Sequence, residues 1–212
     1  MILNIVLIGD SGHSKVITDC INSMTDYKVV AKLDDKHCKK NLLNGIIKGP
    51  LALFEEIRNE FTAKTIICIG GNDIRKNIVE RLKLTENDYI SIVHNNAKIS
   101  DSAIIGVGTV VMPGVIINAD AIVGNHVIIN SNSVIEHDCI VEDFVHVSPG
   151  SIITGGVIIG EGSHIGAGST IIPLKSVGKW SIVGAGSVIV TDIEDRVTAV
   201  GVPGKVIKRE GL

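Results

Sequence analysis

A strict period of six residues runs through the second half of the chain, and it limits the possible folds more than any other feature. Such a period is the signature of a parallel β-helix, in which each repeat forms one short strand and its turn. The composition agrees, because 45% apolar residues, only 3% aromatic residues and 23 glycines favour short Ile- and Val-rich strands over a helical bundle. Every sixth position holds Ile or Val without an insertion, at Ile99, Ile105, Val111, Ile117, Val123, Ile129, Ile135, Val141, Val147, Ile153, Ile159, Ile165, Ile171, Val177, Val183 and Ile189.

The hexapeptide pattern resembles that of the left-handed β-helix, a triangular prism whose coil takes three hexapeptides. We expect about five coils, which at the usual spacing between strands stack to roughly 24 Å. A left-handed crossover is contrary to the usual right-handed rule, so this prediction rests on the repeat and not on general topology.

Side chains alternate in direction along a strand, so the repeat Ile or Val points inward and the residue before it points outward. Many outward positions are themselves apolar, among them Ile104, Ile122, Ile140 and Ile158. Soluble monomers avoid exposing such columns to water. We therefore expect prisms to pack side by side as a homotrimer, the form that this fold usually takes.

Three histidines interrupt this apolar pattern. His137, in the segment "VIEHDC", falls on a corner of the prism beside Asp138. His146 replaces an outward Ile, and His164 follows one coil later on the same face. None of the three fills a core position. We expect functional roles for His137 and His146, whereas a partly exposed surface position without a role is the simpler interpretation of His164.

The first half lacks the hexapeptide repeat and has a different sequence pattern. We therefore expect two domains, residues 1–93 and 94–212. Residues 2–8, 28–33 and 65–69 form buried-strand patterns, and helical patterns follow the first and the third of them, to about residues 24 and 83. Alternation of strand, glycine turn and helix predicts an α/β domain with a parallel sheet, similar to a Rossmann domain. The fold class is therefore an α/β domain followed by an all-β helix.

Ligands of parallel α/β sheets bind at the carboxyl ends of the strands. A glycine turn before a helix offers backbone N–H groups to a phosphate, and an acidic pair accepts hydrogen bonds from a sugar or base. The turn Gly9-Asp-Ser-Gly-His-Ser14 is G-x-x-G, so it lacks the dinucleotide fingerprint G-x-G-x-x-G. A purely structural turn stays open as an alternative. The positions at these strand ends are Gly9, Gly12, His13, Asp34, Asp35, Gly70 and Asn72.

Other features limit the class of protein. The net charge of −3 argues against a general nucleic-acid binder. The four cysteines lack a C-x-x-C spacing and are expected to be free thiols, with Cys139 packed inward. Residues 1–9 are apolar, but they are too few to span a membrane and lack the basic start of a secretory signal. We expect a soluble, cytoplasmic protein without membrane insertion.

Taken together, these motifs resemble one family over essentially the whole chain. The G-x-x-G-H turn, the Asp34-Asp35 pair, "EHDC", "HVSPG" and the terminal "GVPGK" are similar to those of bacterial nucleotide-sugar acetyltransferases of the hexapeptide-repeat class. The nearest type is the UDP-4-amino-sugar N-acetyltransferase of bacillosamine pathways. Sialic acid O-acetyltransferases and perosamine N-acetyltransferases look similar.

The resemblance implies a role for each matching position. The catalytic base falls on His137 and its acidic neighbour, usually Glu, on Asp138, whose shorter side chain leaves the geometry open. Acetyl-CoA contacts fall on His146, Ala167 and Ala185. Asp10 and Lys15 vary in the family's glycine turn and receive no role. Nucleotide-sugar contacts fall on Ser11, Gly12, His13, Asp34, Asp35, Gly70 and Asn72.

The implied reaction is acetyl transfer from acetyl-CoA to an amine of a nucleotide-linked sugar, for surface polysaccharide or glycan synthesis, with no metal. O-acetylation of a sialic-acid-like sugar needs the same base and stays an alternative. A γ-carbonic-anhydrase-like zinc enzyme is a second alternative, although its pair of histidines five residues apart is missing. A catalytically silent scaffold is a third. The nucleotide base and the part played by segment 35–49, which has four lysines, cannot be read from the sequence.

Overall fold

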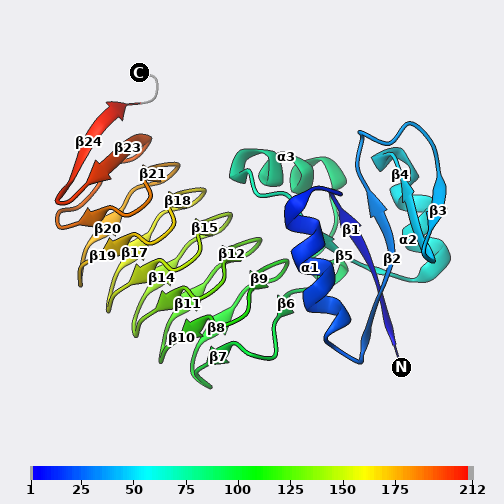
Figure 1. The fold of residues 1–212 in the computed structure, drawn as a ribbon, viewed down its shortest axis with the longest axis horizontal. Helices are drawn as coiled ribbons and strands as arrows, with labels where there is room; N and C mark the ends of the chain where they lie inside the picture. The colour runs from blue at the N-terminus through cyan, green and yellow to red at the C-terminus, as the bar shows by residue number, and fades with distance from the viewer. Residues whose placement is uncertain (1, 210–212) are drawn as a thin grey trace. The chain divides into compact units, whose positions relative to one another are not determined.

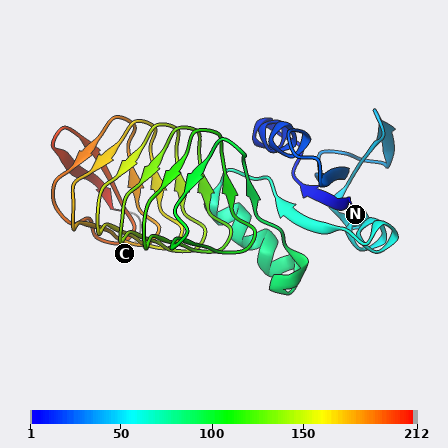
Figure 2. The same cartoon turned by 90° about the horizontal axis from the view of Figure 1, so that it is seen from below.

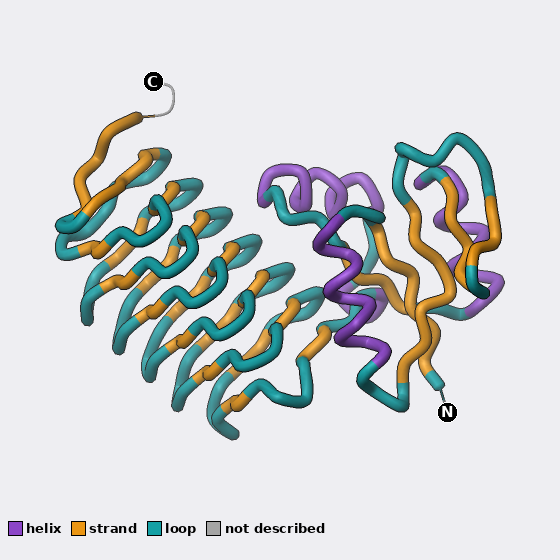
Figure 3. The backbone as a smooth tube through the Cα atoms, in the orientation of Figure 1, coloured by secondary structure: helices purple, strands orange, loops and turns teal. Residues whose placement is uncertain are grey.

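The computed structural model describes residues 2–209, and its internal contacts divide the chain into two units, residues 1–95 and 96–212 (Figure 1). The first unit contains all the α-helices of the described residues, and the second consists of short strands joined by turns (Figure 3). The predicted combination of an α/β domain and a hexapeptide β-helix is therefore confirmed.

The first unit is built on a five-stranded sheet with the strand order β3-β4-β2-β1-β5. Neighbouring strands are parallel except for the β3–β4 pair. The central strands are buried, as their continuous apolar runs predict. Their bounds are β1 (Leu3–Ile8), β2 (Tyr27–Leu33), β3 (Asn41–Leu43), β4 (Ile46–Gly49) and β5 (Lys64–Ile67).

Helices follow the strands as the βαβ pattern predicts, and two further elements were not foreseen. The β3–β4 hairpin turns at Asn44 and Gly45, both with positive φ, where the tight two-residue turn demands it. Helix α2 precedes β5 and is too short to show a clear period in the sequence. The remaining bounds are α1 (Gly12–Asn22), η1 (Leu51–Leu53), α2 (Phe54–Phe61), α3 (Asn72–Leu82), η2 (Glu86–Asp88) and β6 (Ile92–Val93).

In the second unit each hexapeptide forms a two-residue strand, and strands 18 residues apart pair in parallel (Figure 2). Three faces result. Face 1 contains β8 (Ile104–Ile105), β11 (Ile122–Val123), β14 (Ile140–Val141), β17 (Ile158–Ile159) and β20 (Ser176–Val177). Face 2 contains β9 (Val110–Val111), β12 (Ile128–Ile129), β15 (His146–Val147), β18 (His164–Ile165) and β21 (Ile182–Val183). Face 3 contains β7 (Lys98–Ile99), β10 (Ile116–Ile117), β13 (Val134–Ile135), β16 (Ile152–Ile153), β19 (Thr170–Ile171) and β22 (Val188–Ile189).

The prism interior follows the predicted alternation. From Val111 onward every repeat Ile or Val is buried, and the small inward positions carry buried serines. A buried hydroxyl needs a partner, and these serines donate to carbonyls of the next coil, as in the bonds from Ser151 Oγ to Gly166 O (2.9 Å) and from Ser169 Oγ to Gly184 O (2.9 Å). The core is thus held by apolar packing and by bonds between coils.

The second unit ends in an antiparallel pair, β23 (Val197–Gly201) and β24 (Gly204–Arg209), so the "GVPGK" motif forms the turn between them. All four cysteines are free, and Cys139 is buried as predicted, whereas Cys38 is exposed. Over residues 2–209, no helix has the length and apolar character that a membrane span requires.

Candidate functional site

His137 and Asp138 form an ion pair on an exposed corner of the prism, between β13 on face 3 and β14 on face 1. His137 Nδ1 lies 2.7 Å from Asp138 Oδ2. Asp138 has a φ of 60°, a left-handed conformation that short acidic residues tolerate at a tight turn. The bond engages Nδ1, so Nε2 is the ring nitrogen left to meet a substrate. The shorter acid therefore does reach its histidine.

The environment of His137 makes it more basic. The hydrogen bond that the ring donates to Asp138 is the main cause that raises the pKa of the imidazole above its usual value, and the charges of Asp138 and Glu136 add to it. Glu136 is itself held by Asn118, whose Nδ2 donates to Glu136 Oε2 at 2.8 Å from the preceding coil. A histidine with a raised pKa and one free nitrogen is chemically suited to accept a proton.

His146 and His164 lie on face 2, in the outward column that the repeat predicts. Their rings stack with centroids 4.8 Å apart and planes 8° apart. Asn130 Nδ2 lies 3.2 Å from His146 Nε2, and Ser148 Oγ lies 2.8 Å from His164 Nε2. His164 is therefore part of an ordered polar network, which sequence reasoning missed because the repeat shows only that the side chain points outward.

Ala167 and Ala185 lie on the corner that follows face 2, each exposed and flanked by glycine. Gly168 and Gly186 have φ of 66° and 67°, so each turn needs glycine after its alanine. Successive turns are joined by the bond from Gly186 N to Ala167 O at 2.8 Å. The structure thus brings His146, Ala167 and Ala185 to one face and its adjoining corner. His137 lies on the corner opposite that face.

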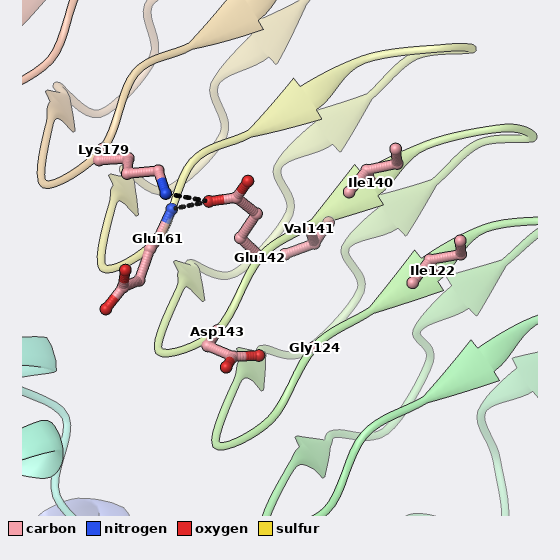
Figure 4. A pocket seen from close by; sticks show the side chains of 8 residues that line it. All are labelled: Ile122, Gly124, Ile140, Val141, Glu142, Asp143, Glu161 and Lys179. Atoms are coloured by element: carbon pink, nitrogen blue, oxygen red, sulfur yellow. Dashed lines mark hydrogen bonds and ion pairs between the residues drawn. The ribbon is translucent and has the colours of Figure 1, made fainter.

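A further hollow lies on face 1, with a volume of about 370 Å³ (Figure 4). Glu142 Oε2 accepts from Glu161 N at 2.9 Å and lies 3.4 Å from Lys179 Nζ. Ile122 and Ile140 form its apolar side. This hollow was not predicted, because its polar residues come from three successive coils and show no common motif.

In the first unit a cavity of about 170 Å³ opens at the carboxyl ends of β1, β2 and β5. It contains two of the predicted substrate residues, Asp34 and Asp35. Asp34 Oδ2 accepts from Asp10 N at 2.8 Å, and Asp35 Oδ1 accepts from Leu51 N at 2.9 Å. Carboxylates above an apolar floor suit a flat polar ring such as a nucleobase. The other lining residues are Ile8, Gly9, Leu33, Leu51, Ile69 and Ile78.

Of the remaining predicted substrate residues, some have free space around them, whereas Asn72 already has a hydrogen-bond partner within the protein. Ser11 is the N-cap of α1 without a side-chain capping bond, and a β-carbon at Gly12 or Gly70 would meet nothing within 4 Å. Asn72, by contrast, is buried, and its Oδ1 accepts from Arg75 Nη2 at 2.9 Å. Its oxygen already serves to hold a buried guanidinium.

His13 is largely buried behind the glycine turn. Burial, and next the nearby positive charge of Arg75, lower its pKa to about 4. The imidazole is therefore neutral at physiological pH. A neutral imidazole has one hydrogen-bond donor and one acceptor, and here its Nε2 is buried.

Asp10 is a buried carboxylate that sequence reasoning left without a role. Its Oδ2 lies 2.8 Å from Lys48 Nζ and 2.9 Å from His37 Nε2. Burial by itself raises the pKa of Asp10, but the hydrogen bonds from Lys48 and His37 outweigh it and hold the pKa below the usual value. Asp10 thereby ties the lysine-rich segment to the glycine turn. The only sequence signal was an acidic residue at a strand end.

Comparison with known proteins agrees with this arrangement. Residues 4–82 match the family described as "PglD N-terminal domain", and residues 138–173 match the family described as "Bacterial transferase hexapeptide (six repeats)". UDP-N-acetylbacillosamine N-acetyltransferase of Bacillus subtilis (strain 168) is 43% identical over 110 residues, a stretch that spans 51% of this chain and 51% of that relative.

Solved structures are similar over nearly the whole chain. A histidine-to-asparagine mutant of perosamine N-acetyltransferase from Caulobacter crescentus, in complex with CoA and GDP-perosamine, has a TM-score of 0.90 and 32% identity, over 98% of both chains. The acetyltransferase domain of PglB from Neisseria gonorrhoeae FA1090, in complex with acetyl coenzyme A, has a TM-score of 0.88 and 33% identity. That match covers 98% of this chain and 100% of the other. This chain therefore belongs to the family of nucleotide-sugar acetyltransferases that join a PglD-type N-terminal domain to a hexapeptide-repeat β-helix.

Proposed function

We propose that this protein transfers the acetyl group of acetyl-CoA to an amine on a nucleotide-linked 4-amino-4,6-dideoxy sugar. The observation that carries the proposal is the His137–Asp138 pair on an exposed corner. His137 Nδ1 lies 2.7 Å from Asp138 Oδ2, so Nε2 is left for a substrate. Relatives named as N-acetyltransferases of amino sugars support the choice of an amine over a hydroxyl acceptor.

His137 acts as the general base. An amine attacks a thioester only through its free electron pair, so the proton it sheds must be accepted. The nitrogen attacks the carbonyl carbon, His137 Nε2 takes the proton, and the C–S bond breaks. The departing CoA thiolate then takes up that proton and leaves as the free thiol, which restores neutral His137. Asp138 holds the ring and stabilises the imidazolium that forms, which a carboxylate bonded to Nδ1 does well. The matched perosamine N-acetyltransferases include histidine-to-asparagine and histidine-to-alanine mutants, which points to a histidine of interest in that enzyme.

The two substrates bind at separate places. The nucleotide binds in the first unit, where Ser11, Gly12 and Gly70 leave open backbone and His13 offers a neutral ring. Asp34 and Asp35 accept hydrogen bonds from its base or ribose. Acetyl-CoA extends along the prism past His146, Ala167 and Ala185, where small exposed residues allow close approach.

The active site is shared between subunits of a homotrimer. Within one prism His137 lies on one corner and His146 on the face opposite it, so one chain alone does not bring both to a single thioester. Packing of prisms supplies the second histidine from a neighbour. It also covers the column of exposed isoleucines on face 1, formed by Ile104, Ile122, Ile140 and Ile158.

We further propose that the reaction takes place in the cytoplasm, where acetyl-CoA and nucleotide sugars are both present. Its product serves the synthesis of a surface polysaccharide or glycan.

The test is a screen of UDP- and GDP-linked 4-amino sugars with acetyl-CoA. CoA release is followed with a thiol reagent, and the product is identified by mass and by the chemical shift of the acylated carbon. Acetylation of the sugar nitrogen is the expected result. Release of CoA only with a hydroxyl acceptor would show an O-acetyltransferase instead. No transfer to any acceptor by the purified trimer would overturn the proposal.

A further inference from the structure

The imidazoles of His146 and His164 on face 2 are held by more interactions than a simple contact with a cofactor requires. His146 and His164 are register partners on adjacent coils, and their rings are nearly parallel at 4.8 Å. Each ring has its own polar partner from the turn that follows a strand of the same face. The two side chains are therefore fixed by stacking and by hydrogen bonds at once.

Asn130 selects one tautomer of His146. Asn130 Oδ1 accepts a hydrogen bond from Ser131 N at 2.9 Å, which fixes the orientation of the amide. The amide nitrogen therefore faces His146 Nε2, at 3.2 Å. An amide –NH₂ only donates, so Nε2 must accept. A neutral imidazole has one acceptor nitrogen, and the proton of His146 is consequently on Nδ1.

Ser148 fixes the second ring. Its hydroxyl is buried and lies 2.8 Å from His164 Nε2. With one end held there, the face of His164 lies against the face of His146 and opposes rotation of that ring. Stacking of aromatic rings in this arrangement is favourable, so it helps to hold the His146 ring in one rotamer.

We propose that His164, Ser148 and Asn130 are positioning residues that hold the His146 imidazole in one plane and as the Nδ1–H tautomer. This inference rests on the proposed role of His146 as an acetyl-CoA contact. It adds a division of labour between the histidines: His146 Nε2 is engaged and does not take the proton of the amine, so His137 is the base and His146 binds without charge.

The tautomer is measured directly by nitrogen-15 NMR of the histidine side chains in the intact protein without substrate. The His146 signals are assigned by their loss in His146→Gln. The expected spectrum has a protonated Nδ1 and an unprotonated Nε2. In Asn130→Asp a carboxylate acceptor replaces the donor, and the proton is expected to move to Nε2. A wild-type His146 with its proton on Nε2, or a tautomer unchanged in Asn130→Asp, would overturn the inference.

Steady-state kinetics test the part played by His164. His164→Ala is expected to raise KM for acetyl-CoA on the order of 10-fold, by analogy with the loss seen when a residue that orients a metal-binding histidine is removed, and to leave KM for the nucleotide sugar unchanged. His164→Phe keeps a flat ring against His146 and is expected to recover most of the loss. Thr170→Val, on face 3, is the matched control. An unchanged KM for acetyl-CoA in His164→Ala, or a failed recovery in His164→Phe at equal melting temperature, contradicts the proposal.

The two experiments separate this inference from the proposed function. If the wild-type protein acetylates no nucleotide sugar, the NMR spectrum still decides the tautomer of His146 and its dependence on Asn130. If acetylation is found but the tautomer is the other one, only the positioning claim fails.

Discussion

The imidazole of His137 lies over Gly155, its counterpart 18 residues later on the same corner of the prism. A β-carbon at Gly155 would lie 2.6 Å from Nε2 and 2.7 Å from Cε1 of that ring. The position of the proposed base therefore depends on the absence of a side chain one coil away. Gly155 is not among the glycines with positive φ, so the reason for glycine here is space and not backbone conformation.

Gly155→Ala should impair catalysis without impairing the fold. The methyl group must push the exposed His137 ring aside, and a displacement of about 1 Å at a reacting group can lower a rate about 10²-fold. We expect kcat to fall by this order while KM for both substrates and the melting temperature stay near wild type. Pro173→Ala, on the same corner one coil further on, is the control and should keep full activity. Full activity of Gly155→Ala would show that the ring does not work from this position.

His137→Ala should remove most of the activity. General-base assistance is worth about 10²–10⁴-fold, which corresponds to roughly 3–5 kcal/mol in the barrier. The side chain is 63% exposed, so its loss should leave the melting temperature nearly unchanged. The measurement is kcat with acetyl-CoA and the accepted nucleotide sugar. Normal turnover by this variant would assign the base to another group.

The pH profile should report the His137–Asp138 bond. The hydrogen bond to Asp138 raises the pKa of His137, and a general base works only when deprotonated. The acid limb of kcat/KM should therefore reflect this raised pKa, with activity lost as pH falls through it. Asp138→Asn removes the carboxylate, so the limb should move to lower pH and the plateau should drop because the base is weaker. If the acid limb of Asp138→Asn stays at the wild-type pH, the titrating group is a residue other than His137.

His13 should make stability depend on pH in a defined window. Its pKa is about 4 in the folded protein and near 6.5 when the chain is unfolded. Between these pH values the imidazole is protonated in the unfolded chain but not in the native state. The contribution of His13 to the free energy of unfolding is therefore full above about pH 6.5 and declines toward pH 4. The shift corresponds to a loss on the order of 3 kcal/mol. Urea unfolding at several pH values, without ligand, should show this slope in wild type and a shallower one in His13→Gln.

Asp10→Ala should weaken the nucleotide site. It leaves Lys48 and His37 without their shared partner, so the chain that follows Asp34 and Asp35 loses its side-chain tie to the glycine turn. Breaking a buried charge pair by removing one member is strongly destabilising locally. We expect KM for the nucleotide sugar to rise roughly 10-fold or more, a change of about 1.4 kcal/mol per tenfold, with kcat little changed. Glu56→Gln breaks the exposed pair with Lys40 and serves as the control, because exposed pairs contribute little. Equal KM values in the two variants would contradict a positioning role for Asp10.

The fold of the second unit could be predicted from the amino-acid pattern. A period of six with Ile or Val at every repeat predicts a parallel β-helix, and the resemblance to left-handed β-helices implies a three-sided coil with strands 18 residues apart. The same period placed His137 on a corner and His146 and His164 on one face, because direction follows from position in the repeat. The βαβ pattern likewise located the strand ends that line the cavity at Asp34 and Asp35.

Which polar atoms contact one another became clear from the three-dimensional arrangement and not from the pattern. The carboxylate of Asp10 reaches Lys48 and His37 across 38 and 27 positions in the chain, and no local pattern encodes that separation. The stack of His146 on His164 and the space that Gly155 leaves for His137 arise where coils are laid one upon another. A repeat fixes the direction of a side chain, but the distance to its partner is set by the packing of coils and strands in space.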